Sequence, residues 1–161
     1  MKLPLVTVAA VTIACGPGAP GGPTMHNKLN DEPPAQTSPV ISTDILARDP
    51  ITNHASIVHI LIGWNGSSDA EHRDPRAATR TKHDAEELVR ELVGKLKTGA
   101  DFDALMKQYS EDPGSATGHS YEVSPDASLV IEFRQLGTRL RVGEIGVVQT
   151  EYGLHIMKRV R

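Results

Sequence analysis

Two short segments of the chain place a histidine within a run of apolar and β-branched residues. Residues 55–62 read ASIVHILI and residues 150–157 read TEYGLHIM. Such runs are typical of buried β-strands. Because a buried imidazole needs a hydrogen-bond partner, we expect His59 and His155 to lie close together and to satisfy each other. A polar pair inside a small apolar core is a candidate functional site.

Between these predicted strands the apolar positions change to helical spacing. The segment from Thr81 to Gly99 carries one apolar stripe at intervals of three and four residues, and its first residues fit a capping box. A second, shorter helix is predicted to begin at Asp101, and a third, weaker one to span residues 128–136. A further short strand is expected at residues 147–149. The residues expected to be buried by the three helices are Ala85, Leu88, Val89, Leu92, Val93, Leu96, Phe102, Leu105, Met106, Tyr109, Leu129, Phe133 and Leu136.

The first residues differ from the rest of the chain. One lysine precedes an apolar run from Leu3 to Ala14, which is too short to span a bilayer as a helix and suits a secretory signal at residues 1–15. The residues Thr-Ile-Ala-Cys that end at Cys15 resemble a bacterial lipobox, which predicts lipidation of Cys15. The alternative is a plain signal peptide, or a mis-assigned start, in which Cys15 has no role.

Residues 16–52 are expected to be a disordered tether. The stretch from Gly16 to Pro39 holds six prolines and four glycines and shows almost no apolar periodicity. Residues 40–46 suit either a short strand or a short helix. The folded domain is therefore expected to span residues 53–161.

Composition excludes several classes of function. A formal net charge of −3 gives no electrostatic reason to expect a nucleic-acid partner. A single cysteine rules out an internal disulfide and a multi-cysteine zinc site. The histidines at 54, 72 and 83 lack ligand spacing, so no metal and no cofactor is expected. Aromatic residues make up 4% of the chain, so the core should be mostly aliphatic.

The order of motifs over residues 53–161 resembles the parvulin-type peptidyl-prolyl cis/trans isomerases, or rotamases. The strand with His59 is followed by a helix, G-x-D-F-x-x-L, S-E-D, an apolar segment, L-x-x-G-E-I and T-x-Y-G-x-H-I. The matching residues are His59, Leu61, Gly99, Asp101, Phe102, Leu105, Ser110, Glu111, Asp112, Pro113, Phe133, Leu140, Gly143, Glu144, Ile145, Thr150, Tyr152, Gly153, His155 and Ile156.

The resemblance implies an α+β fold with a small, mostly antiparallel four-stranded sheet and three to four packed helices. It also implies an exported isomerase that assists the folding of unfolded or nascent polypeptides containing X-Pro bonds. Such a protein would lie in a bacterial cell envelope, on the periplasmic side or the cell surface, held at the membrane by the lipid on Cys15. The implied catalytic residues are His59, Asp112, Thr150 and His155, and those implied to bind the proline are Tyr121, Leu129 and Phe133.

Two departures from the family pattern leave alternatives open. The family usually has a Gly-Gly-Asp-Leu-Gly-like run where this chain has His119 and Glu122 at two glycine positions, so a non-catalytic chaperone or peptide-binding module is the second hypothesis.

Leu129 and Phe133 fit an ordinary helix core equally well. The loop of residues 63–80 carries three arginines of the kind that bind phosphate, but interleaved acidic residues favour a solvated flap.

Overall fold

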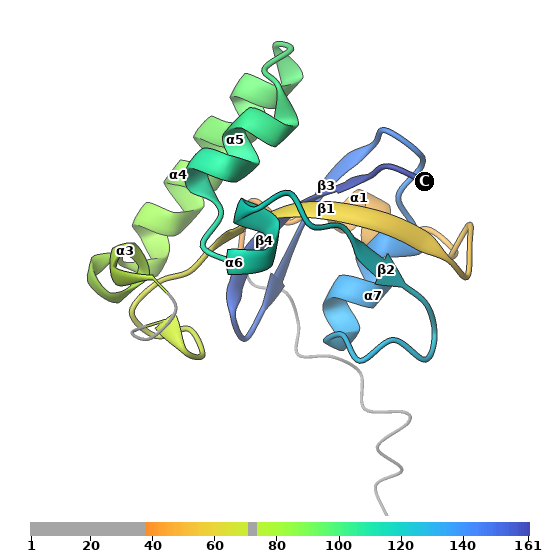
Figure 1. Cartoon of the computed structure of the whole chain (residues 1–161), viewed down its shortest axis with the longest axis horizontal. Helices are drawn as coiled ribbons and strands as arrows, with labels where there is room; N and C mark the ends of the chain where they lie inside the picture. The colour runs from red at the N-terminus through yellow and green to blue at the C-terminus, as the bar shows by residue number, and fades with distance from the viewer. Residues whose placement is uncertain (1–37, 71–73) are drawn as a thin grey trace, which may run out of the picture. The chain divides into compact units, whose positions relative to one another are not determined.

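The centre of the fold is a four-stranded sheet in the order β2-β1-β4-β3 (Figure 1). The computed structural model describes residues 38–70 and 74–161. Strand β1 (Ala55–Ile62) pairs antiparallel with β2 (Tyr121–Val123) and β4 (Gly153–Arg159), and β4 pairs antiparallel with β3 (Ile145–Thr150). This confirms the predicted α+β class and the antiparallel four-stranded sheet.

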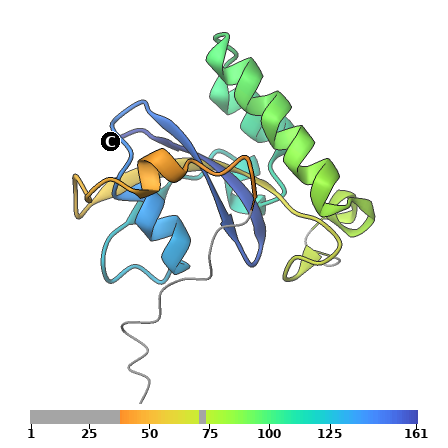
Figure 2. The same ribbon diagram turned by 180° about the vertical axis from the view of Figure 1, so that it is seen from behind.

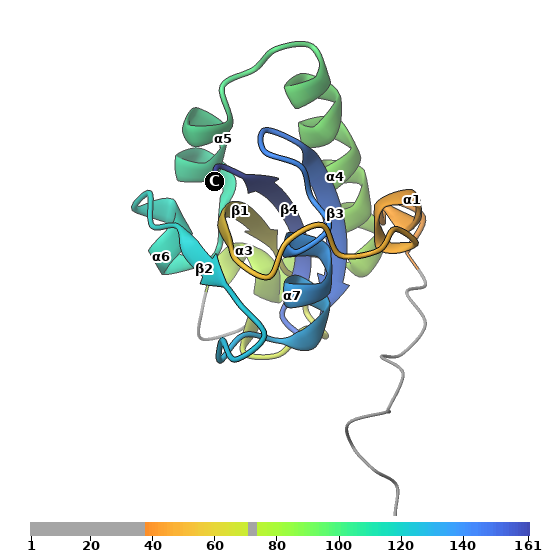
Figure 3. The same cartoon turned by 90° about the vertical axis from the view of Figure 1, so that its right-hand side faces the viewer.

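The two faces of this sheet are covered by different helices. Helices α4 (Lys82–Lys97) and α5 (Phe102–Tyr109) pack on one face, and α7 (Ile131–Gly137) packs on the other, so that β1 and β4 lie between them in Figure 3. Because strand side chains alternate, neighbouring residues of one strand enter different cores. The strand residues buried beneath α4 and α5 are Val58, Ile60, Ile62, Val147, Leu154 and Ile156. Those buried beside α7 are Ala55, Ile57, Val123, Val148 and Met157.

The long helix begins where the sequence predicted. The Thr81 hydroxyl accepts a hydrogen bond from the Asp84 N–H, and the Asp84 carboxylate accepts one from the Thr81 N–H, which completes the capping box. At the start of α5, the Asp101 carboxylate caps the helix by accepting a hydrogen bond from the Ala104 N–H. Helix α7 begins at Ile131 rather than at residue 128, because Val130 has extended ψ (148°) and ends the irregular lead-in.

The turn between β3 and β4 corrects the single strand expected at residues 150–157. Thr150 ends β3, and Gly153 begins β4 after a two-residue turn. Gly153 has φ of +144°, and a Cβ there would lie 2.5 Å from the Ile62 carbonyl oxygen. The position therefore requires glycine.

The packed domain begins before residue 53. Helix α1 (Thr43–Leu46) buries Ile45 beside α7. The Ser42 N–H donates to the Val147 carbonyl, and the Val147 N–H donates to the Ser42 hydroxyl, so this segment covers the outer edge of β3 (Figure 2). The assignment of residues 38–52 to a disordered tether is therefore wrong, and of the two alternatives for residues 40–46 the helix is the one that forms, at residues 43–46.

The predicted signal at residues 1–15, with Cys15, and the tether up to residue 37 lie outside the described residues. Within residues 38–70 and 74–161, no helix has the length and apolar character needed to cross a membrane.

Candidate active site

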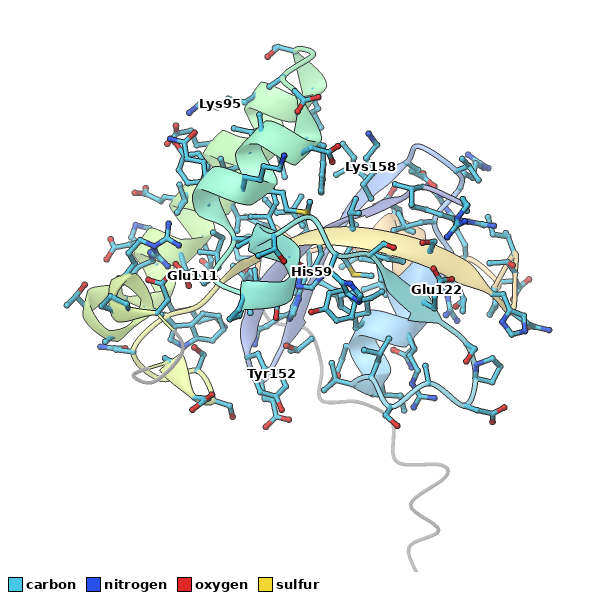
Figure 4. The ribbon with its side chains drawn as sticks, viewed as in Figure 1. His59, Lys95, Glu111, Glu122, Tyr152 and Lys158 are labelled. Carbon is cyan, nitrogen blue, oxygen red and sulfur yellow. The ribbon has the colours of Figure 1, made fainter. Side chains whose placement is uncertain are left out.

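The two histidines meet on the α7 side of the sheet. His59 on β1 lies opposite Met157, and His155 on β4 lies opposite Leu61, so the imidazoles are diagonal neighbours on adjacent strands. Their ring centroids are 5.1 Å apart with an interplanar angle of 50°, and both side chains are buried. The structure thus brings together the two residues on which the sequence analysis depended, with His59 near the centre of Figure 4.

The hydrogen bonds of these rings differ from the expected mutual pair. The Thr150 hydroxyl lies 2.8 Å from Nε2 of His155, so the predicted hydroxyl neighbour is in place. The ring of His59 is contacted by the buried hydroxyl of Ser115, whose Oγ lies 3.2 Å from Nδ1 and 3.3 Å from Nε2. His59 therefore does not bond to His155, and each imidazole has its own hydroxyl partner.

Asp112 lies beside this pair at the start of the short helix α6 (Pro113–Ala116). Its Oδ2 accepts hydrogen bonds from the Ser115 N–H and from the Tyr121 hydroxyl, both at 2.7 Å. The same oxygen is 3.9 Å from Nε2 of His59. One carboxylate thus connects a helix cap, the phenol of β2 and the histidine of β1.

The electrostatics of this cluster keep His59 neutral and Asp112 ionised at neutral pH. Burial lowers the pKa of His59 from 6.5 to about 4, although the Asp112 carboxylate opposes the change. Burial raises the pKa of Asp112, but hydrogen bonds from Tyr121 and Ser115 outweigh it and leave this pKa below its usual value. Burial, together with the bond to Asp112, also raises the pKa of Tyr121, so the phenol remains a donor.

A cavity of about 530 Å³ opens beside the histidines. The ring of Phe133 lies edge-on to both imidazoles, with its centroid 5.1 Å from that of His59 and 5.5 Å from that of His155. The centroid of the Tyr121 ring is 6.1 Å from that of Phe133, so aromatic rings form one wall of the cavity. The cavity therefore combines an apolar wall with a few polar groups, the usual composition of a ligand site. Its lining residues are His59, Leu61, Asp69, Asp112, Pro113, Tyr121, Ser128, Leu129, Val130, Phe133, Tyr152 and His155.

The sequence profile of the PPIC-type PPIase domain family matches residues 43–160. The chain belongs to this family. The match covers the sheet, α7 and every residue of the site, and it begins at α1.

Curated relatives agree with this assignment. The foldase protein PrsA of Geobacillus kaustophilus is 41% identical over 75 residues, which are 45% of this chain and 27% of the relative. The chaperone SurA of Pseudomonas fluorescens is 38% identical over 82 residues, 49% of this chain and 19% of the relative. The PPIase domain thus matches about a quarter or less of these longer proteins.

Two solved structures share the fold. The peptidyl-prolyl isomerase ESS1 from Candida albicans superposes with a TM-score of 0.61 at 19% identity, over 68% of this chain and 63% of that one. The solution structure of TbPIN1 gives a TM-score of 0.59 at 25% identity, over 69% of this chain and all of that one.

Ser115 and Gly114 are site residues that the sequence analysis missed. A Cβ on Gly114 would lie 2.6 Å from the Tyr121 hydroxyl oxygen, so the glycine makes room for the phenol that reaches Asp112. A signal was present in the sequence, since Asp-Pro-Gly-Ser is an N-cap followed by proline at the first helical position. That pattern predicts the cap but not the contact of the Ser115 hydroxyl with a distant strand.

The departures of this PPIase domain at two glycine positions are accommodated without backbone strain. His119 packs edge-on against Tyr121 with centroids 5.3 Å apart, and Glu122 lies 3.4 Å from Arg161. Among the described residues, Asp69 is the one non-glycine residue with positive φ. His119 therefore packs against Tyr121, a residue of the cavity wall, without straining the backbone.

The arginines of the loop after β1 serve structural contacts. Arg80 forms an ion pair with buried Glu111 and donates to the Gly63 carbonyl, while Arg76 pairs with Asp74 beside the short helix α3 (Pro75–Thr79). The third arginine, at position 73, lies outside the described residues. Among the described residues, no cluster of three potential metal ligands occurs.

Proposed function

We propose that this domain catalyses cis/trans isomerisation of X-Pro bonds in unfolded or nascent exported polypeptides. The observation that carries the proposal is the cavity in which Phe133 and Tyr121 face the paired imidazoles and the Asp112 carboxylate. We expect the apolar wall to hold the pyrrolidine ring and the polar groups to face the preceding amide.

The reaction needs no covalent step. The barrier to rotation of an X-Pro bond, roughly 18–20 kcal/mol, arises from amide resonance. In the twisted transition state the amide loses conjugation, so its carbonyl oxygen carries less negative charge and its nitrogen regains a lone pair. A catalyst acts by binding this twisted state more tightly than either planar one.

Three side chains of the cavity suit the stabilisation of the twisted amide, namely those of Asp112, His59 and Phe133. An ionised Asp112 near the substrate carbonyl would disfavour the planar amide, whose oxygen is more negative. A neutral His59 adds a hydrogen-bonding group without cancelling that charge. Phe133 and the neighbouring Leu129, both in the cavity wall, would hold the proline ring and exclude water from the amide.

We further propose that the domain works outside the cytoplasm of a bacterium, attached through a lipidated Cys15. The apolar start of the chain and its lipobox-like residues support this location. Incorporation of labelled palmitate into the full chain, absent from the Cys15→Ser variant, tests the anchor separately from the activity.

The decisive experiment is two-dimensional exchange NMR on an Ala-Pro peptide with a catalytic amount of the full chain. We expect faster cis/trans exchange with wild type than in buffer. If folded protein gives cis/trans exchange no faster than in buffer, the proposed isomerase activity is ruled out. If the peptide still binds in that case, the domain is a non-catalytic peptide-binding module.

A further inference from the structure

One buried carboxylate joins the two ends of the connection between β1 and α4, which runs from residue 63 to residue 80. Oε2 of Glu111 accepts a hydrogen bond from the Gly63 N–H at 2.7 Å, and Oε1 lies 2.5 Å from Nη1 of Arg80. The same Nη1 donates to the Gly63 carbonyl at 2.8 Å. The first and last residues of the connection are therefore held together by Glu111, and we call these three residues the Glu111 clasp.

The burial of this carboxylate gives the clasp its strength. The side chain of Glu111 is 0% exposed and that of Arg80 is 13% exposed. A buried carboxylate is tolerated only when it is paired and hydrogen-bonded, and both oxygens of Glu111 have a donor. The residue thus commits its whole hydrogen-bonding capacity to the two ends of one connection.

The segment that starts at the clasp forms part of the cavity wall. Asp69 lies on this segment and lines the cavity together with Tyr152 of the β3–β4 turn. Beside it, the Ser68 N–H donates to the Glu151 carbonyl at 2.8 Å, so the segment also contacts that turn. Asp69 has φ of +58°, which a residue other than glycine keeps only where surrounding contacts hold it. The position of this wall therefore depends on where the clasp fixes the start of the segment.

Bonds that do not involve the carboxylate hold the neighbouring polar groups of the site. The Glu111 N–H donates to the Leu61 carbonyl at 2.9 Å, and the Leu61 N–H donates to Oγ of Ser110 at 3.2 Å. Asp112 has its own hydrogen bonds within the site. A change in the Glu111 side chain should therefore release the connection and leave Asp112 in place beside β1.

We propose that Glu111 is a positioning residue for substrate binding, whose carboxylate holds both ends of the 63–80 connection and thereby places the cavity wall at Asp69. Glu111 acts through this wall rather than on the reacting amide, so it affects KM more than kcat. The consequence for turnover rests on the proposed isomerase function, whereas the consequence for peptide binding does not.

The chain offers a matched control in Glu144. Its Oε1 lies 2.7 Å from Nη1 of Arg48, and its Oε2 accepts a hydrogen bond from the Arg141 N–H at 2.8 Å. It therefore has the same kinds of partner as Glu111, one arginine and one backbone N–H, although its side chain is 22% exposed. Glu144 is not among the residues that line the cavity. Glu111→Gln and Glu144→Gln thus remove the same charge from similar partners beside the cavity and away from it.

The test measures peptide binding, turnover and the state of the connection in the full chain. NMR titration and exchange spectra of an extended Ala-Pro peptide give Kd, KM and kcat. Glu111→Gln should raise Kd and KM about fivefold, with kcat within about twofold of wild type. Trp64 directly follows Gly63 and is the only tryptophan of the sequence, so acrylamide should quench its fluorescence more strongly in this variant. Glu144→Gln should leave all of these values unchanged.

Unchanged Kd and KM in Glu111→Gln, or a fall in kcat without a rise in KM, would overturn the proposal. If that variant does not fold, Glu111→Gln combined with Arg80→Met leaves no unpaired charge buried and should raise Kd in the same way. If wild type binds the peptide without accelerating its exchange, the isomerase function fails, but the comparison of Kd values still decides the role of Glu111. A wild type that binds no peptide would overturn both.

Discussion

The two faces of the sheet are built from the same strands but differ in chemistry. On the face beneath α4 and α5, consecutive inward positions of β1 are Val58, Ile60 and Ile62, and the helices cover them with apolar side chains, including Phe102 and Met106. On the α7 face, the alternating positions of the same strand include His59, and β4 contributes His155. The shorter α7 covers this face incompletely and leaves the cavity.

The difference separates stability from chemistry within one strand. The closed face buries mainly apolar surface, and such burial is the main source of folding free energy. The open face buries two imidazoles, an arrangement that is tolerated because Thr150 and Ser115 provide hydroxyl partners. Because alternate side chains of a strand point to opposite faces of the sheet, a small domain can have a polar site on one face and a fully packed apolar core on the other.

The largest effect is expected on the closed face. Ile60→Ala should lower the free energy of unfolding by about 3–4 kcal/mol, because Ile60 is fully buried between α4 and the sheet. The kcat/KM of the molecules that remain folded should change by less than about twofold. Urea denaturation and peptide exchange NMR measure the two quantities. A large loss of kcat/KM in folded protein would show that the faces are coupled.

The second largest effect is expected from acid pH, which should lower the free energy of unfolding through His59 on the open face. The unfolded chain binds a proton on His59 below pH 6.5, but the folded chain does so only below about pH 4, so stability falls as pH falls through this window. The gap between the two pKa values corresponds to about 3 kcal/mol. The carboxyl of Asp112, with its lowered pKa, adds a loss only at lower pH.

Chemical denaturation between pH 7 and pH 4 measures this dependence, with His59→Gln as the control because glutamine does not titrate. The free energy of unfolding of the variant should change less with pH over the same range. An equal pH dependence of this free energy in wild type and His59→Gln would mean that His59 is not the group responsible.

Asp112→Asn should affect activity more than stability. The amide keeps an oxygen that accepts from Ser115 and Tyr121, so the free energy of unfolding should change by less than about 1 kcal/mol. Removal of the negative charge should lower kcat/KM about 30-fold, equivalent to about 2 kcal/mol. Peptide exchange at pH 7 gives the rate, and a variant as active as wild type would exclude the carboxylate from the chemistry.

The smallest effect is expected for Tyr121→Phe. The substitution keeps the ring in the cavity wall and removes the hydroxyl that donates to Asp112, so kcat/KM should fall about three- to fivefold, or about 1 kcal/mol. Tyr109→Phe, on α5 at the closed face, is the control and should leave kcat/KM unchanged. Similar losses in both variants would argue against a specific role for the Tyr121 hydroxyl.

Local patterns allowed much of the fold to be predicted. Strand β1 and helix α4 begin where the continuous run of apolar and β-branched residues and the capping box place them, because burial and capping are encoded within a few residues. His59 and His155 do lie close together as predicted, but the hydrogen-bonding neighbours of the two rings are the hydroxyls of Ser115 and Thr150.

Features that depend on tertiary contacts were missed. The hydroxyl of Ser115 reaches His59 only because α6 packs on β1, and no spacing in the sequence indicates that contact. Residues 38–46 look like a linker by composition, and their few apolar residues become buried only at the edge of β3. Likewise, Thr150 belongs to β3 because Gly153 provides the turn.

The most direct test of the central claim is a single NOESY experiment with exchange on an Ala-Pro peptide mixed with the full-length protein. The account predicts contacts between the proline ring protons and the aromatic protons of Phe133, together with cis/trans exchange peaks that are stronger than in buffer. Contacts that lie instead on the α4–α5 side, or contacts at Phe133 without enhanced exchange, would contradict a prolyl isomerase centre on the open face.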